Sequence, residues 1–211
     1  MVSRRLFLIF MGSIVSSVAL FPRVVLANKN NESLKSGAKN FIEKLAEEAL
    51  ISLTKSELTV VERRELFRDI MRRYFAFKII AKWVLGRYWN RASDKEKGEY
   101  LTLFEKLMVI TYADRFQTYS GEKLVVVKSE TRGKSDILVH TFLERPNDQE
   151  PIAVIWRLRA RKNSYKIIDV MVEGLSMGIT QQKEFSSVIR KNGNKVEGLL
   201  SELRKRINVD S

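Results

Sequence analysis

The hydrophobic periodicity of the chain changes once, near Gly121, and this change constrains the fold more than any other feature. Before it, apolar residues recur at spacings of three and four, the pattern of helices with one buried face. After it, apolar and polar residues alternate over four segments joined by short polar connections, the pattern of antiparallel hairpins. Helices segregated from strands predict an α+β fold, with an antiparallel sheet of about four strands and helices packed on one face.

The third of these strands is the most asymmetric. One set of alternate positions is apolar and the other carries three arginines, which predicts one buried face and one solvated basic face. The apolar set is Ile152, Val154, Trp156 and Leu158, and the basic set is Arg157, Arg159 and Arg161. The four strands are expected at residues 123–131, 136–144, 152–161 and 165–172.

The helical half begins after a polar linker, Asn28 to Lys35, with an apolar stripe from Ala38 to Leu53. Two capping boxes open further helices, because a Ser or Thr is followed three residues later by Glu. These boxes are Thr59 with Glu62 and Ser93 with Glu96, and the helix after Ser93 is expected to extend to about Tyr119. Two more helices close the chain, separated at Asn192-Gly193.

Residues 1–27 have the organisation of an export signal. Arg4 and Arg5 give a positive start of the twin-arginine type, and an apolar-to-neutral run of sixteen residues ends at Phe21. This run is shorter than the ~20 residues of a spanning helix. We expect cleavage after Ala27, which leaves 28–211 as a single mature domain outside the cytoplasm; an uncleaved N-terminal anchor is the alternative.

The mature chain is basic and has no cysteine. The net charge is +13, and the first 27 residues contribute three arginines and no acids, which leaves +10. Outside the cytoplasm such charge favours anionic lipid surfaces over nucleic acid, although it can also serve solubility alone. The lack of cysteine excludes thiol nucleophiles, CxxC redox chemistry and thiolate metal sites.

Catalytic constellations are scarce. His140 is the only histidine, which excludes a site of several histidines, and its place in an alternating strand indicates an ordinary sheet residue. Gly174–Gly178 matches the Gly-x-Ser-x-Gly string around Ser176, but an antiparallel sheet and a histidine that precedes the serine do not fit a hydrolase. Asp169 lies in an apolar strand, where backbone amides or an arginine usually satisfy a carboxylate. We therefore expect no catalytic residue, metal or cofactor.

Binding is the function that the large apolar residues favour. The segment Phe75–Leu85 is apolar nearly all round, apart from Lys78 and Lys82 on one narrow face, and Gly86 is expected to end it. Such a helix is buried on most sides or faces an apolar cavity. An ordinary filled core is the competing interpretation of the same aromatic residues.

Two stretches resemble the signatures of one family. Leu85-Gly86-Arg87-Tyr88-Trp89, followed by Ala92-Ser93, is similar to the first, and Ile168-Asp169-Val170-Met171-Val172-Glu173-Gly174-Leu175-Ser176 is similar to the second. With this order and spacing, residues 35–207 resemble the MlaC family of the lipid-asymmetry pathway, also known as the toluene-tolerance family. The twin-arginine start departs from the ordinary secretory signal of that family and leaves the export route open.

The resemblance implies a deep apolar cavity between helices and sheet, with Asp169 a structural acid and Gly174–Ser176 a turn. It implies a periplasmic carrier of glycerophospholipid, acting as a monomer, which docks transiently on an outer-membrane lipoprotein complex and an inner-membrane ABC-transporter complex. Two acyl chains hold on the order of 30 methylenes at ~0.8 kcal/mol each, roughly 25 kcal/mol together. The pocket should therefore lie near the upper end of ~300–1,000 Å³. The residues expected to line it are Phe75, Ile79, Trp83, Leu107, Ile110, Val154 and Trp156.

Two other functions compete with the carrier. One is an exported adaptor with a filled core that uses its basic face to bind partner proteins. The other is a hydrolase that uses Ser176. Binding to nucleic acid is disfavoured by the export signal.

Overall fold

The computed structural model describes residues 23–209, except 134, 148 and 162–163. Residues 1–22 of the expected export signal lie outside the described residues. The rest of it, residues 23–27, forms the start of helix α1, Arg23–Leu53. The linker expected at Asn28–Lys35 is therefore wrong, because this stretch is helical throughout. It contains no Pro or Gly, and the carbonyls of Leu34 and Lys35 are anchored by hydrogen bonds from the hydroxyls of Tyr165 and Ser129.

The sheet confirms the expected α+β class. Its strands pair in chain order, and every pair is antiparallel. The fifth strand was not expected, because two residues are too short to show alternation. The strands are β1 Lys123–Arg132, β2 Asp136–Glu144, β3 Ile152–Arg161, β4 Ser164–Val172 and β5 Leu175–Ser176.

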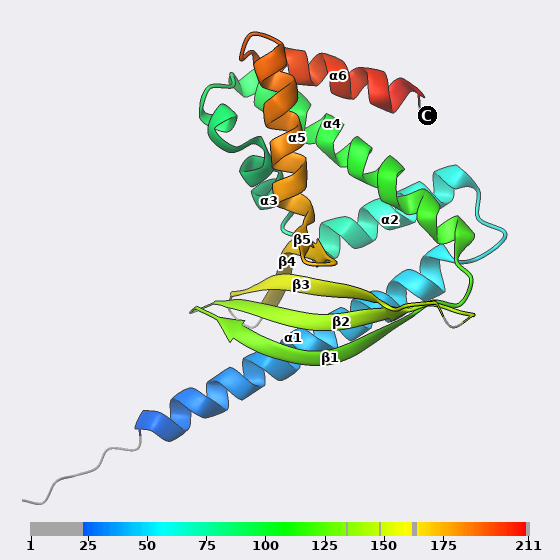
Figure 1. Ribbon diagram of the computed structural model, residues 1–211, viewed down its shortest axis with the longest axis vertical. Helices are drawn as coiled ribbons and strands as arrows, with labels where there is room; N and C mark the ends of the chain where they lie inside the picture. The colour runs from blue at the N-terminus through cyan, green and yellow to red at the C-terminus, as the bar shows by residue number, and fades with distance from the viewer. Residues whose placement is uncertain (1–22, 134, 148, 162–163, 210–211) are drawn as a thin grey trace, which may run out of the picture.

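One face of the sheet is buried under helix α1, which runs along β1, β2 and β3 (Figure 1). Ile137, Val139 and Leu158 from the strands pack there against Ile42 and Leu53 of the helix. The two capping boxes that open the next long helices are both confirmed. The remaining helices gather on β4 and on one another, and Figure 1 shows them beyond that strand. They are α2 Val60–Tyr74, α3 Phe77–Leu85, α4 Asp94–Ala113, α5 Met177–Lys191 and α6 Val196–Val209.

The helices α3–α6 enclose a second core of their own. Tyr100 and Phe104 of α4 stack with ring centroids 5.6 Å apart, and Phe185 of α5 meets both rings edge-on. The expected long helix after Ser93 stops at Ala113 and continues as a 3₁₀ turn, η2, over Asp114–Thr118. The domain thus has one core under the sheet and one among the helices.

The chain breaks between α2 and α3, where a continuous apolar helix from Phe75 was expected. Phe75 is extended, with φ −101° and ψ 148°, and forms a parallel bridge to Ile167 of β4. The amide of Ala76 donates to the carbonyl of Ile167 at 2.9 Å, so it bonds to the sheet instead of a preceding helical turn. Gly86 ends α3 as expected, with φ 58°.

Among the described helices, none combines the length and apolar character required to cross a bilayer.

Candidate functional site

An apolar pocket lies where the sheet core meets the helical core. Its wall takes side chains from helices α2–α5, the turn η2 and strands β3 and β4, so no single element defines it. All but two of the lining residues, Asp169 and Gln181, are apolar, aromatic or glycine. The lining residues are Phe67, Met71, Phe75, Phe77, Ile80, Val84, Phe104, Met108, Tyr112, Phe116, Trp156, Asp169, Val170, Met177, Gly178 and Gln181.

The pocket is smaller than the argument from acyl chains required. Its volume is about 300 Å³, the lower end of the range for ligand sites and not the upper end. Aromatic rings fill much of the space between the layers, among them Phe77 and Phe104, whose centroids lie 5.4 Å apart. Burial raises the pKa of the Tyr112 phenol in this wall, so the ring stays neutral and the pocket carries no charge from it at physiological pH.

Asp169 is the carboxylate at the pocket wall, and its oxygens are already used. Oδ2 accepts from the Ser176 hydroxyl at 2.7 Å, and Oδ1 accepts from the amides of Val170 at 2.9 Å and Gly178 at 3.2 Å. These bonds tie the end of the sheet to the first turn of α5. Asp169 therefore has the arrangement of a structural acid that fixes the pocket wall.

Ser176 caps helix α5, since its Oγ accepts from the amide of Ile179 at 3.0 Å. The sheet register aligns His140, Ile155, Met171 and Ser176 across four successive strands. Three strand spacings of ~4.8 Å place His140 about 14 Å from Ser176. His140 instead bonds Glu130 at 3.0 Å, so the two residues do not form a nucleophile–base pair.

Two of the seven predicted lining residues, Phe75 and Trp156, are in the wall of this pocket. Phe75 is placed by its bridge to β4. Trp156 is held by a hydrogen bond from its Nε1 to the Oγ1 of Thr141 at 3.1 Å, and Thr141 in turn donates to the carbonyl of Val154. The polar edge of the indole is thus satisfied inside the sheet.

The other five predicted residues lie outside the wall of this pocket. Leu107 is buried in the helical core, with Ile110 against it, and Val154 is buried in β3. Trp83, 38% exposed, covers the seam between α3 and α5, and Ile79, 55% exposed, lines a separate groove. Ile79 and Trp83 share α3 as expected, whereas Phe75 lies before that helix. Which neighbour each side chain meets depends on packing between elements.

The wall contains residues that sequence reasoning missed, notably Met108 of α4 and Met177 and Gln181 of α5. Met108 is the next residue after Leu107, so the face of α4 was misjudged by one position. Met177 follows directly on the Ile168–Ser176 stretch, and that adjacency was the available signal. No periodic pattern marks Gln181.

Gly178 of α5 lies directly against the side chain of Trp83 of α3. A Cβ at this position would lie 2.1 Å from Cζ3 of Trp83. We expect Gly178→Ala to lower the free energy of unfolding by about 1 kcal/mol, because ~1–3 kcal/mol of overpacking exceeds the helix-propensity gain of up to ~1 kcal/mol. Urea unfolding of the variant and the wild type measures this difference in free energy. The control Gly98→Ala, in α4 with nothing within 4 Å, should be neutral or stabilising; equal behaviour of the two variants would contradict the packing argument.

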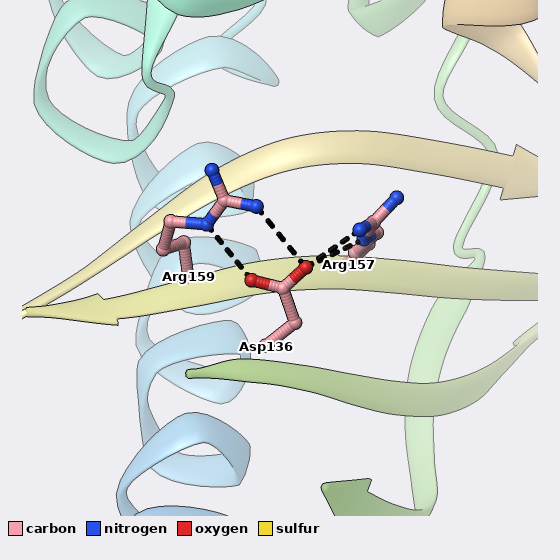
Figure 2. Close-up of polar contacts among 3 residues, drawn as sticks. All are labelled: Asp136, Arg157 and Arg159. Atoms are coloured by element: carbon pink, nitrogen blue, oxygen red, sulfur yellow. Dashed lines mark hydrogen bonds and ion pairs between the residues drawn. The ribbon is translucent and has the colours of Figure 1, made fainter. Parts of the chain in front are cut away.

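The expected basic face of β3 carries an acid at its centre. Asp136 of β2 pairs with Arg159 in the register, and its carboxylate accepts from Arg157 at 2.6 and 3.0 Å and from Arg159 at 2.8 and 3.2 Å (Figure 2). Asp136 is 7% exposed. This face is solvent-accessible as expected, with the Arg157 and Arg159 side chains 34% and 45% exposed. It is not purely basic, because the hairpin brings a carboxylate of the neighbouring strand between the two arginines.

The architecture defines the class: an α+β domain with an antiparallel sheet, a helical layer and an apolar pocket between them. A family model described as MlaC protein matches residues 43–205. The intermembrane phospholipid transport system binding protein MlaC of Haemophilus influenzae is 21% identical over 145 residues, 67% of either chain. The chain belongs to the MlaC family, as the sequence resemblance predicted.

A solved structure supports the fold independently. The phospholipid-binding protein of Ralstonia solanacearum, determined in complex with a phospholipid, matches with a TM-score of 0.74 and 21% identity. The match covers 82% of this chain and 98% of the other. The expectation of an α+β fold with a segregated antiparallel sheet is thus confirmed.

Proposed function

We propose that this protein is a periplasmic phospholipid carrier, which takes up glycerophospholipid in its apolar pocket and moves it between an outer-membrane lipoprotein complex and an inner-membrane ABC-transporter complex. The observation that carries this proposal is an almost wholly apolar pocket inside a member of the MlaC family. Two relatives support the proposal, because one is named as a phospholipid transport binding protein and the structure of the other was determined in complex with a phospholipid.

The energetics favour enclosure of the acyl chains. Each methylene removed from water contributes ~0.8 kcal/mol, so the chains must be covered during passage through an aqueous compartment. The pocket of about 300 Å³ accommodates only part of two chains, and uptake requires the aromatic wall to move outward. That wall is built from side chains of several helices and two strands, so outward movement of individual side chains can enlarge it.

The N-terminal segment and the function named for the relatives support a periplasmic location. Residues 1–27 have the pattern of an export signal, and a carrier between two membranes must work in the space between them. The basic mature chain suits transient contact with anionic surfaces or partners on both sides.

The first test is native mass spectrometry of the mature chain, starting at Asn28, with organic extraction of the bound material. We expect an added mass of a phospholipid, released on extraction as glycerophospholipid. A clean protein mass that stays unchanged after incubation with phospholipid vesicles would contradict the carrier and favour an exported adaptor with a filled core.

A further inference from the structure

A second hollow lies beside the apolar pocket and has a different character. It is a groove of about 720 Å³, and Phe75 and Phe77 line both hollows. The two spaces are therefore neighbours across these two rings. The groove is lined by the end of α2, the start of α3, the middle of α4 and one residue of β4, namely Arg72, Phe75, Ala76, Phe77, Lys78, Ile79, Leu101, Thr102, Glu105 and Lys166.

The groove carries three cations and one acid. The charge of Arg72 is compensated, because its Nε and Nη2 donate to the carboxylate of Glu105 at 2.6 and 2.8 Å. These hydrogen bonds to Glu105 raise the pKa of Arg72. Lys166 donates to the carbonyls of Arg72 and Arg73 at the end of α2 and has no carboxylate partner in the part of the chain that the structure describes. Lys78 has neither an ion pair nor a hydrogen bond from its ammonium to any described residue. The groove therefore has a net positive charge from two lysines.

Next to this charge stand apolar side chains. Ile79 is 55% exposed and lines the groove together with Phe75, Phe77 and Leu101, so apolar surface is available there to a hydrocarbon part of a ligand. The Lys78 ammonium is unpaired among the described residues, and the Lys166 ammonium keeps one N–H beyond its two carbonyl partners. These cations lie beside apolar side chains and next to an almost wholly apolar pocket. The arrangement matches an amphiphile whose anionic group is directly attached to its hydrocarbon part.

We propose that this groove is the site of the phosphodiester of the bound phospholipid, with Lys78 and Lys166 as its ligands and Ile79 against the glycerol and upper acyl carbons. The proposal rests on the proposed function and adds to it a site for the headgroup. Phe75 and Phe77 then stand at the junction, with the chains passing between them into the apolar pocket. Phosphate chemistry is common to all glycerophospholipids, so the site selects for the class and not for one headgroup.

The test compares two lipids with the same acyl chains, phosphatidylglycerol and diacylglycerol, on the wild type and on Lys78→Glu. We expect the variant to weaken phosphatidylglycerol binding about tenfold or more and to leave diacylglycerol binding unchanged, because only the former presents a phosphate. The matched control is Lys82→Glu, one helical turn further along α3 and outside the lining of the groove, which should bind both lipids like the wild type.

The possible outcomes distinguish a failure of the headgroup site from a failure of the carrier function. Unchanged phosphatidylglycerol binding by Lys78→Glu would overturn the headgroup site while the carrier stands, whereas a wild type that binds neither lipid would overturn the carrier itself. Equal weakening by Lys78→Glu and Lys82→Glu would also overturn the site, since it would indicate a general charge effect. A titration with inorganic phosphate distinguishes the source: Lys78-dependent binding of free phosphate without any effect on lipid affinity would assign the groove to free phosphate and contradict the proposal.

Discussion

Met108→Trp is expected to yield a folded protein that binds phospholipid at least tenfold more weakly than the wild type. Met108 projects from α4 into the wall of the apolar pocket, and the larger indole occupies space that acyl carbons need. Exclusion of two methylenes costs about 1.6 kcal/mol at ~0.8 kcal/mol each, which corresponds to slightly more than a tenfold loss of affinity. Displacement of a fluorescent phospholipid measures the affinity, and thermal unfolding checks the fold.

The control for this variant is Thr111→Trp, on the exposed side of the same helix. It adds a larger side chain without entering the pocket and should bind lipid like the wild type. Ile80→Trp, from α3 on another side of the pocket, provides a second obstruction in case Met108→Trp disturbs the helical core. Folded Met108→Trp and Ile80→Trp proteins with unchanged affinity would show that the acyl chains lie elsewhere.

Asp136→Asn is expected to lower the free energy of unfolding by about 2–3 kcal/mol at pH 7. The amide keeps one acceptor oxygen but replaces the other with an NH2 group that cannot accept from a guanidinium, and it removes the negative charge between Arg157 and Arg159 beside a buried position (Figure 2). Urea unfolding of both proteins measures the difference. Asp94→Asn, at a fully exposed side chain, is the control and should stay within ~0.5 kcal/mol of the wild type.

The difference in free energy of unfolding between the wild type and Asp136→Asn should also depend on pH, in a direction set by the pKa of Asp136. Burial by itself raises the pKa of Asp136, but the hydrogen bonds from Arg159 and Arg157 outweigh it and hold the pKa below its ordinary value. A carboxylate with a lower pKa in the folded state stabilises the protein above its unfolded pKa of ~3.9, and this stabilisation is lost as the pH falls through the folded pKa. The difference between wild type and Asp136→Asn should therefore shrink below about pH 4. A difference that is the same at pH 7 and pH 3 would contradict this assignment.

The local elements followed from the sequence because their causes are local. Alternation in the strands and the Thr59–Glu62 and Ser93–Glu96 boxes depend on neighbours within a few residues, and the long strands matched to within a residue. The errors arose where a distant partner intervened. Phe75 left its helix because β4 supplies a carbonyl that accepts a hydrogen bond from the following amide. Two arginines of the expected basic face are paired with a carboxylate because β2 supplies Asp136.

The class of fold, the order of the elements and the family could be predicted from the sequence, since periodicity, capping and two short signatures are properties of local sequence. Which large apolar residues border a pocket and which fill a core depends on the tertiary packing. Leu107 and Met108 are adjacent and both apolar, yet one is buried in the helical core and the other lines the pocket. Periodicity identifies the face that is removed from water, but whether that face meets a side chain or a hollow depends on how several helices and the sheet come together.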